Sequence, residues 1–525
     1  MTAKYKIPGV YVEEVKAFHN SILPVPTAIP AFVGYTPQAS FEGKSYYNVP
    51  KKITSFADFK AIFCYPDAPE PATPIKQYNP EYYLVKQKHK PNKGSYITIA
   101  GEFYAIVPDP NTIYYMYNSI QLFYENGGGD AYIVSVGTYG SPSKKPMHPE
   151  EKIVNANVKL DDLQNGIALL KKEQEPTMYI CPEATLLSVA NNGTLMQSML
   201  FQNSEMQTAI SVFDIIGGDK PDPILFTEDI EVFRNNTGAK GLSFGCAYYP
   251  FIATATMLQQ DIDFTNLFGG DITCLEALLN SPSAPNEIAA EILKTIQNIN
   301  ESDLTIAQLN TALLAASNTY AAIIKKVLAA VNMLPPSGAI AGVITTTDNQ
   351  VGVWKAPANT SIVGAVSLPI NLTSANQEYL NVDAVSGKSI NAIRLFNGLG
   401  ILIWGARTLD GNSNEWRYIP VRRTLIFLEQ SCTLATKAFV FEPNNSSTWL
   451  VVKEMISNFL YSIWRQGGLQ GAKPEDAFFV RCGLNETMTN HDILNHIMIV
   501  NVGVSVVRPA EFIIFSFQQK MAQSS

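Results

Sequence analysis

The chain has 525 residues, of which 46% are hydrophobic and 16% are charged, and its formal net charge at pH 7 is −8. This length exceeds what one hydrophobic core supports and indicates two or three domains. The acidic balance argues against general nucleic-acid binding, which needs basic patches against phosphate, and the sequence has no apolar run of about 18 residues, the length that spans a bilayer.

The N-terminal segment, residues 1–25, predicts an extended connector arm. Its first residues contain no apolar signal core, so synthesis should end in the cytoplasm. Pro8-Gly9 interrupts the chain just before a short β-prone run. Because an isolated strand leaves its N–H and C=O groups unpaired, this run must fold back onto its own sheet or complete the sheet of a neighbouring chain. The residues of the run are Val10, Tyr11, Val12 and Val15.

Residues 26–334 predict an α/β domain. Short runs that are apolar throughout alternate with amphipathic stretches, which is typical of a parallel sheet covered on both faces. Ser55 is expected to cap a short helix, and Thr112 to start a longer helix that the glycines at 127–129 end. Strands are predicted at 31–34, 131–136, 178–181, 211–216 and 242–249, and further helices at 160–172 and 227–235.

Two insertions interrupt this domain. The first, at about 66–110, is rich in Pro and Tyr and contains an alternating run at 96–100, which predicts a small β excursion on the surface. The second, at about 264–334, is helical, and its amphipathic stripes are expected to pack inside the insertion because surface helices usually face their own core. The apolar residues that recur at intervals of four are Ile288, Ile292 and Ile296.

Residues 335–507 predict a separate α+β domain, and residues 508–525 predict a C-terminal connector arm. Pro509 fixes φ and removes a donor, so the chain is expected to bend there before a terminal strand begins. In the domain, strands are predicted at 362–368, 400–407, 478–480 and 497–507, and an amphipathic helix at 448–464. The large apolar residues of the arm strand are Phe512, Ile513, Ile514 and Phe515.

Residues able to perform catalysis are sparse and scattered. None of the five histidines falls at a strand end of the α/β domain, where a catalytic base normally sits. His491 and His496 do not have the spacing of metal ligands on one helix face. The glycines at 127–129 close a helix instead of opening one, so they predict a helix cap and not a phosphate loop. We therefore predict no catalytic, cofactor or metal site, while a hydrolase-like α/β enzyme built from isolated residues stays open as the rival class.

Several motifs, in order along the chain, resemble those of the contractile tail sheath proteins of phages and of phage-like bacterial injection systems. Runs 8–15 and 27–34 resemble the N-terminal signature of that family, and run 126–134 is similar to its glycine turn and strand. In the C-terminal half the similar runs are 335–343, 348–349, 352–359, 391–394, 404–409, 416–419, 421–423, 441–444 and 478–480.

This resemblance implies a subtilisin-like middle domain without protease activity, in a structural subunit of a contractile sheath. Such subunits sit in stacked hexameric rings around an inner tube, and their arms add strands to the sheets of neighbouring subunits. Contraction would drive the tube through a target envelope with energy stored at assembly, since the sequence has no nucleotide-binding motif. The implied partners are further copies of the chain, the inner tube protein, and baseplate and terminal cap proteins, with no nucleic acid and no membrane insertion.

The resemblance also implies in which particle the protein works and where it is made. The expected particle is a phage tail or a phage-tail-like machine that is made in a bacterial cytoplasm, with release outside the cell as a further expectation. The two insertions depart from a minimal sheath subunit and are expected to decorate its outer surface. A baseplate component of the same machine is a structural rival, which the sheath-like motifs at both termini disfavour.

The contact with the inner tube is predicted to come from the C-terminal domain. The polar side of helix 448–464 and the turn after it carry basic residues, which would meet an acidic tube surface through weak, screened pairs of about 0–1 kcal/mol each. Weak pairs suit a joint that must release on firing, and a solvated helix face is the alternative interpretation. The basic residues are Lys453, Arg465 and Lys473.

Overall fold

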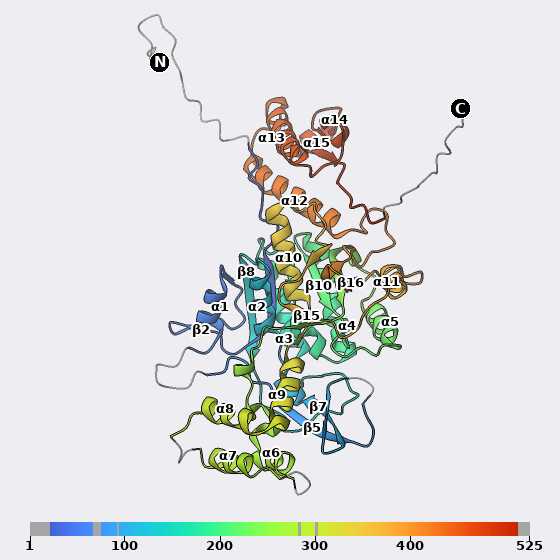
Figure 1. Cartoon of the computed structure of the whole chain (residues 1–525). Helices are drawn as coiled ribbons and strands as arrows, with labels where there is room; N and C mark the ends of the chain where they lie inside the picture. The colour runs from blue at the N-terminus through green and yellow to red at the C-terminus, as the bar shows by residue number, and fades with distance from the viewer. Residues whose placement is uncertain (1–20, 67–74, 92–93, 282–284, 300–302, 513–525) are drawn as a thin grey trace, which may run out of the picture. The chain divides into compact units, whose positions relative to one another are not determined.

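The computed structural model describes residues 21–512, except 67–74, 92–93, 282–284 and 300–302 (Figure 1). These residues divide into two compact units: unit 1 holds residues 21–25 and 427–507, and unit 2 holds residues 26–426 and 508–512. The sequence analysis began the C-terminal domain at residue 335. The division after Ile426 corrects that boundary, and the reason lies in the main sheet of unit 2.

A nine-stranded sheet forms the centre of unit 2 (Figure 1). Its strand order is β14 (Thr360–Ser361), β17 (Gly400–Trp404), β16 (Asn391–Phe396), β11 (Gly245–Tyr249), β10 (Ile210–Asp214), β9 (Met178–Ile180), β1 (Pro30–Thr36), β8 (Ala131–Thr138) and β4 (Lys51–Ile53). The strands from β11 to β8 run parallel, as predicted, and every residue of β1, β10 and β11 is buried. Mixed α/β architecture is therefore confirmed.

The edge strands of this sheet explain the corrected boundary. β16 pairs in parallel with β11 through Tyr248–Asn391 and Tyr249–Ala392, and β17 and then β14 extend the sheet in antiparallel register. At the opposite edge β4 pairs in antiparallel fashion with β8. Because residues 391–404 complete the α/β sheet, they cannot belong to a separate domain. The run predicted at 400–407 contains β17 of this sheet, and the run predicted at 362–368 contains a strand of a smaller sheet in unit 2.

Helices cover both faces of the sheet. On one face lie α2 (Met116–Glu125) and α10 (Ser337–Gln350), and the ring of Phe123 in α2 meets that of Phe32 at a centroid distance of 5.5 Å. On the other lie α3 (Leu160–Leu169), α4 (Val189–Met206) and α5 (Phe226–Asn236), and Gly166 of α3 sits against Val33. Successive residues of a strand point to opposite faces, so Phe32 and Val33 assign the two layers to opposite sides of the sheet.

Local signals place most, but not all, of these helices. Ser55 caps α1 (Phe56–Phe63) and accepts the Asp58 N–H, as predicted. α2 begins at Met116 instead of Thr112, because a 3₁₀ turn capped by Asp109 occupies 110–112. The sequence pattern does not predict α4, whose buried side chains include amides that hydrogen-bond inside the protein instead of a regular apolar stripe. Nor does it predict α10, which is buried over most of its length.

The two insertions have the predicted classes of structure. The first forms an antiparallel sheet of β5 (Tyr82–Gln87), β7 (Glu102–Pro108) and β6 (Tyr96–Ile99). The second contains α6 (Ile272–Leu279), α7 (Glu287–Gln297), α8 (Ile306–Ala316) and α9 (Asn318–Val331). They brace one another: Lys76 Nζ lies 2.9 Å from Asp263 Oδ2 and 2.9 Å from Asn266 Oδ1, and the rings of Tyr83 and Phe268 meet edge-on.

Unit 1 contains the predicted amphipathic helix. It runs over α13 (Ser446–Arg465), where the Asn445 side chain caps the N-terminus and the apolar face buries Ile456, Phe459 and Ile463. The Phe427 ring packs on Phe459 at 5.9 Å. Around α13 lie α14 (Pro474–Ala477), β18 (Phe478–Arg481), α15 (Asn490–Leu494) and β19 (Asn501–Val504).

The remaining elements are short, apart from one helix. α12 (Ile419–Thr436) begins in unit 2 and ends in unit 1. Unit 2 also contains β2 (Ser40–Phe41) paired with β3 (Lys44–Ser45), a sheet of β13 (Met333–Leu334), β12 (Ile252–Thr254) and β15 (Ala365–Ser367), and α11 (Ser374–Asn381). Within the described residues no single helix has the length and apolar composition to cross a membrane; α8 and α9 reach them only when taken together across a bend of 118°.

Candidate assembly surfaces at the arm roots and the two-stranded sheet

A two-stranded antiparallel ribbon in unit 1 offers unpaired strand edges. β18 pairs with β19 from Phe478–Val504 to Arg481–Asn501, and in the described part of the chain the outer edge of each strand has no third strand beside it. Val480 is buried, whereas Phe479 and Val502 are 48% and 42% exposed. A two-stranded ribbon is marginal by itself, and open edges are templates for strand addition. Each outer edge of the ribbon is therefore a candidate for strand addition.

Thr27, which we call the N-terminal root, follows the N-terminal arm and is held by an arginine of a buried ion pair. The Thr27 carbonyl accepts from Arg423 Nη2 and from Thr177 Oγ1, each at 2.8 Å. The Arg423 guanidinium in turn donates to both carboxylate oxygens of Asp348, at 2.9 and 2.6 Å. The side chains of Arg423 and Asp348 are only 3% and 2% exposed, so the pair is shielded from solvent. The N-terminal segment therefore enters the sheet at β1 from a fixed point.

The predicted strand residues of the arms lie almost entirely beyond the described residues. Val10, Tyr11, Val12 and Val15, and also Ile513, Ile514 and Phe515, are outside them. Phe512 is described, and its side chain is 74% exposed. This position does not bury Phe512 against its own subunit, and the pairing of both arms stays a prediction.

The three basic residues predicted to contact a tube lie at two places along α13 and the turn after it. Lys453 lies in α13 with its Nζ 3.9 Å from Glu486 Oε2, an exposed and weak pair. Arg465 is the last residue of α13, and Lys473 precedes α14. Trp464 donates to the Gly471 carbonyl at 3.0 Å, which folds the turn containing Lys473 back toward the end of α13. Lys453 is three turns earlier, about 18 Å along the helix, so only Arg465 and Lys473 lie near the same end.

Comparisons with known proteins find similar chains among phage tails and contractile injection systems. The family model of the phage tail sheath C-terminal domain matches residues 412–520. The tail sheath protein of Vibrio phage KVP40 is 30% identical over 139 residues, and the matched region spans 26% of this chain but only 20% of the length of that protein. A chain of the anti-feeding prophage helical sheath in its contracted state is 26% identical, with a TM-score of 0.55 over 98% of this chain and 100% of that one.

Two further solved structures match over nearly the whole chain. A chain of the sixfold-symmetrised anti-feeding prophage baseplate is 25% identical, with a TM-score of 0.57 over 98% of this chain and all of that one. A chain of the PVC sheath complex in its contracted state, from an extracellular contractile injection system, is 24% identical, with a TM-score of 0.56 over 99% of both chains. Residues 412–520 are thus similar to the phage tail sheath C-terminal domain, and nearly the whole chain is similar in fold to chains of contractile sheath complexes.

Two buried carboxylates, which the sequence analysis missed, lie just after β9 and at the end of β10, the strand ends where α/β enzymes bind ligands. Glu183 Oε1 accepts the N–H groups of Tyr115 (3.3 Å) and Met116 (2.8 Å) at the start of α2. Asp214 accepts the N–H (2.9 Å) and hydroxyl (2.5 Å) of Ser337 at the start of α10. Burial raises the pKa of each carboxyl to about 7 despite these hydrogen bonds. Both groups cap buried helix N-termini, which explains their position structurally.

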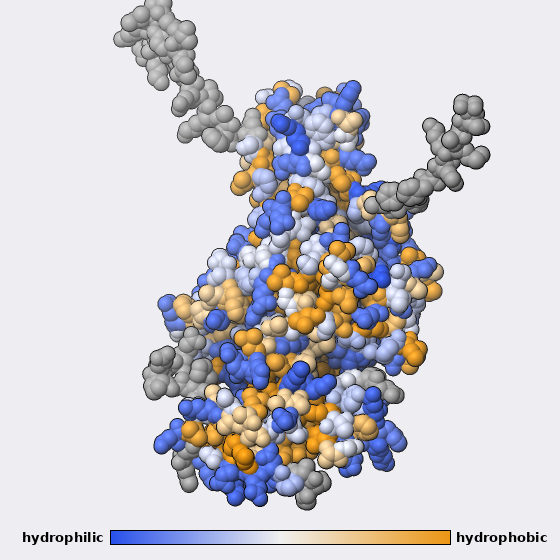
Figure 2. Space-filling model, in the orientation of Figure 1, coloured by the Kyte–Doolittle hydropathy of each residue, from blue (hydrophilic) through white to orange (hydrophobic). Residues whose placement is uncertain are grey.

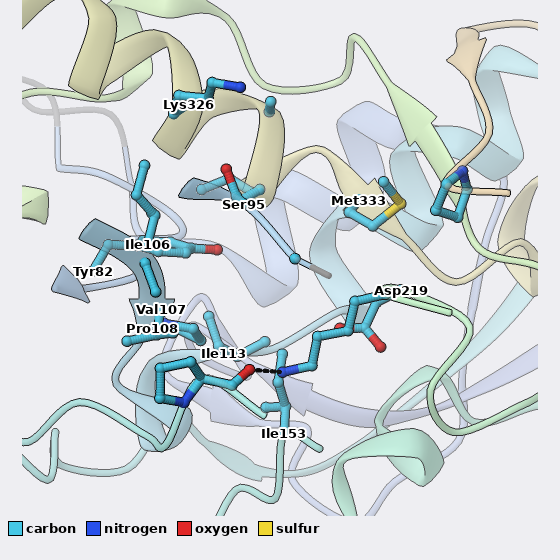
Figure 3. A pocket seen from close by; sticks show the side chains of 18 of the residues that line it. Tyr82, Ser95, Ile106, Val107, Pro108, Ile113, Ile153, Asp219, Lys326 and Met333 are labelled. Carbon is cyan, nitrogen blue, oxygen red and sulfur yellow. Dashed lines mark hydrogen bonds between the residues drawn. The ribbon is translucent and has the colours of Figure 1, made fainter. Parts of the chain in front are cut away.

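A cavity of about 450 Å³ lies where the β insertion and α9 meet the loops at 149–153 and 219–223 (Figure 3). Its walls are mainly apolar, with Ile106 and Met333 among them, and Asp219 and Lys326 are charged residues on its lining. The residues that line it include no histidine, so the cavity does not assemble a Ser-His-Asp arrangement. Within the described ranges there is also no group of three or more His, Cys, Asp or Glu residues placed to hold a metal.

Proposed function

We propose that this protein is a sheath subunit, which polymerises as stacked hexameric rings around an inner tube and contracts to drive the tube through a target envelope. The observation that supports this best is the β18–β19 ribbon, whose two open edges match in number the two terminal strands predicted from the sequence. Strand addition would supply affinity through main-chain hydrogen bonds and register through alternate side chains. Each ribbon would then accept one arm from each of two neighbouring subunits.

Exposed apolar side chains support a subunit that is covered in an assembly. Among the large apolar side chains of unit 2, Val385, Val366 and Leu399 are each more than half exposed. On the face shown in Figure 2, apolar side chains gather over the helical insertion and over the middle of unit 2. Extensive apolar exposure of this kind marks protein interaction sites more often than free surface. We therefore assign parts of these surfaces to contacts between copies of the chain.

The partners follow from the same proposal. Arg465 and Lys473, near one end of α13, would meet an acidic surface of the inner tube protein through weak pairs that release when the sheath contracts. Baseplate and terminal cap proteins would contact the two ends of the polymer. The energy of contraction would be stored at assembly, and neither catalysis nor nucleic-acid binding is part of the function. The particle would be a phage tail or a phage-tail-like machine made in a bacterial cytoplasm.

A second candidate function is a sheath-like component of the baseplate, which the match to a chain of the anti-feeding prophage baseplate favours. Negative-stain microscopy of the expressed chain separates the two. A sheath subunit should form long, hollow, striated cylinders, whereas a baseplate component should give discrete rings or particles. Discrete particles with hydrolytic activity would contradict both and support the rival enzyme.

A further inference from the structure

The described part of the C-terminal arm ends in a carboxylate held by an almost buried arginine. Glu511 Oε1 accepts from Arg407 Nε at 3.0 Å, and Glu511 Oε2 accepts from Arg407 Nε at 3.2 Å and Nη2 at 2.5 Å. The Arg407 side chain is 6% exposed and that of Glu511 is 22% exposed. A guanidinium that donates to both oxygens of a carboxylate fixes its orientation as well as its distance.

Two further donors converge on the same carboxylate. The Tyr418 hydroxyl donates to Glu511 Oε2 at 3.1 Å, and Asn381 Nδ2 donates to Glu511 Oε1 at 3.1 Å. Asn381 ends α11, Arg407 follows β17, and Tyr418 precedes α12. Hydrogen bonds from Arg407, Asn381 and Tyr418 hold the pKa of Glu511 below its usual range even though burial raises it. We call Asn381, Arg407, Tyr418 and Glu511 the arm clamp.

The arm clamp is built on the main sheet of unit 2. The Arg407 N–H donates to Asn391 Oδ1, and Asn391 Nδ2 donates to the Arg407 carbonyl, both at 2.8 Å. Asn391 is the first residue of β16, the strand that joins β11. Arg407 also forms an isolated β-bridge with Tyr418, and its Nη1 donates to the Asn381 carbonyl at 3.0 Å. Arg407 and Tyr418 are therefore positioned by each other, and Arg407 is also positioned by the sheet.

We propose that Glu511 is a positioning residue that fixes the point at which the C-terminal arm leaves unit 2, so that a pull on the arm is delivered to the nine-stranded sheet. This inference rests on the proposed function, in which the arm links one subunit to another. The last backbone pairing of unit 1 before the arm is the bridge between Leu469 and Val506. Without the arm clamp, the free tether would begin after that bridge instead of at Glu511.

The difference in tether length is large on the scale of strand pairing. Residues 507–511 would add up to about 18 Å of extended chain at ~3.5 Å per residue. One residue of register in a strand is about 3.4 Å, so this slack spans several register positions. It would also route the pull into the two-stranded ribbon of unit 1 instead of the larger sheet. The arm clamp thus sets both the reach of the arm and the unit that moves with it.

The test compares Glu511→Gln with Glu175→Gln as a matched control. Glu175 also accepts from a cation and a tyrosine, Lys52 at 2.8 Å and Tyr132 at 3.0 Å, but neither of these partners belongs to the arm clamp. Polymerised protein would be measured by sedimentation and negative-stain microscopy, and hydrogen exchange would be followed in the 505–512 peptide of soluble subunits. Tyr418→Phe, which removes one donor only, serves as a milder second variant.

We expect Glu511→Gln to keep the thermal midpoint of the wild-type subunit while exchange in the 505–512 peptide rises and ordered cylinders fall about tenfold, as a loss of about 1.4 kcal/mol per contact would give. Tyr418→Phe should fall between this variant and the wild type, and Glu175→Gln should match the wild type. Normal cylinders and unchanged exchange in Glu511→Gln would overturn the arm clamp and leave the proposed function intact. Wild-type protein without cylinders would overturn the proposed function, while the exchange data would still decide whether Glu511 holds the arm.

Discussion

At the scale of single residues, the buried charges of unit 2 are placed to hold backbone segments. Glu183 and Asp214 cap α2 and α10, and Arg423 with Asp348 holds the Thr27 carbonyl at the root of the N-terminal arm. Each group satisfies donors or acceptors that would otherwise be buried without partners. These residues therefore help to set where α2, α10 and the segment leading into β1 begin, which is a structural role.

The capping carboxylates predict a pH dependence of stability. Burial raises the pKa of Glu183 and Asp214 to about 7 in the folded protein, well above the ordinary carboxyl values near 4 of an unfolded chain. Their stabilisation is therefore complete below about pH 4 and is lost as the pH rises through about 7. The thermal midpoint of soluble subunits should fall between pH 5 and pH 8, and Glu183→Gln should flatten that fall. An unchanged slope in Glu183→Gln would contradict this role.

The ion pair at the N-terminal root predicts a large loss of stability when one partner is removed. Asp348→Ala leaves the Arg423 guanidinium buried and uncompensated, which should lower the free energy of unfolding by about 3–5 kcal/mol. Urea denaturation followed by circular dichroism would measure it. Lys52→Ala, which removes an exposed pair with Glu175, is the control and should change the free energy by less than about 1 kcal/mol. Equal effects of the two substitutions would show that Asp348 is no anchor.

At the scale of elements, α13 and the β18–β19 ribbon divide the proposed contacts of unit 1. The apolar face of α13 is buried within the unit, with Val452, Met455 and Leu460 among its core residues. Its polar side and the turn after it stay exposed. A ribbon with two open edges suits strand addition, while an exposed helix end suits weak polar contacts. The strand contacts of the ribbon would therefore hold through contraction, whereas the polar contacts of the helix end would release during it.

The helix end predicts a charge-dependent contact with the tube. Arg465→Glu combined with Lys473→Glu should leave the subunit folded but impair its assembly on the tube, because both residues are exposed near the same end of α13. Lys453→Glu, about 18 Å away along the helix, is the matched control. Co-sedimentation with purified tube at low and high salt would measure the contact, which salt should weaken in the wild type. Unchanged co-assembly of the double variant would remove this assignment.

At the scale of the whole molecule, unit 2 is a braced body that fixes the chain at two points, just after residues 21–25 of unit 1 and at the start of the C-terminal arm. Its two insertions are far apart in the chain yet support one another through Lys76, Asp263 and Asn266. The N-terminal root is tied at Thr27 and the C-terminal root at Glu511. Under the proposed function, such a body moves as one piece during contraction while the strands at its ends stay paired with neighbours.

The connector role of the N-terminal arm predicts that folding and polymerisation are separable. Deleting residues 1–19 should leave a folded, soluble subunit, because the root at Thr27 and all of β1 remain. The truncated subunit should not form cylinders, since it lacks the strand proposed to complete a neighbour's ribbon. Circular dichroism and negative-stain microscopy would check the two parts. Full-length cylinders from the truncated chain would show that the arm is not a connector.

Local chemistry let the sequence by itself determine the class of fold and many of its elements. The apolar run in β1, the Ser55 cap of α1 and the amphipathic stripe of α13 are each encoded within one segment, so periodicity and capping revealed them. The tail sheath resemblance likewise rested on ordered local motifs. Periodicity did not predict polar helices such as α4, because their burial depends on hydrogen bonds to distant residues instead of an apolar stripe.

Only the tertiary structure decided which distant segments meet. β16 joins β11 across more than a hundred residues, which moved the domain boundary from 335 to the link after Ile426. The arm clamp gathers Asn381, Arg407 and Tyr418 around Glu511, and no local pattern marks any of them as its partner. Strand partners and buried charge pairs are selected by contacts between residues far apart in the chain, so they become visible only when the whole chain has packed.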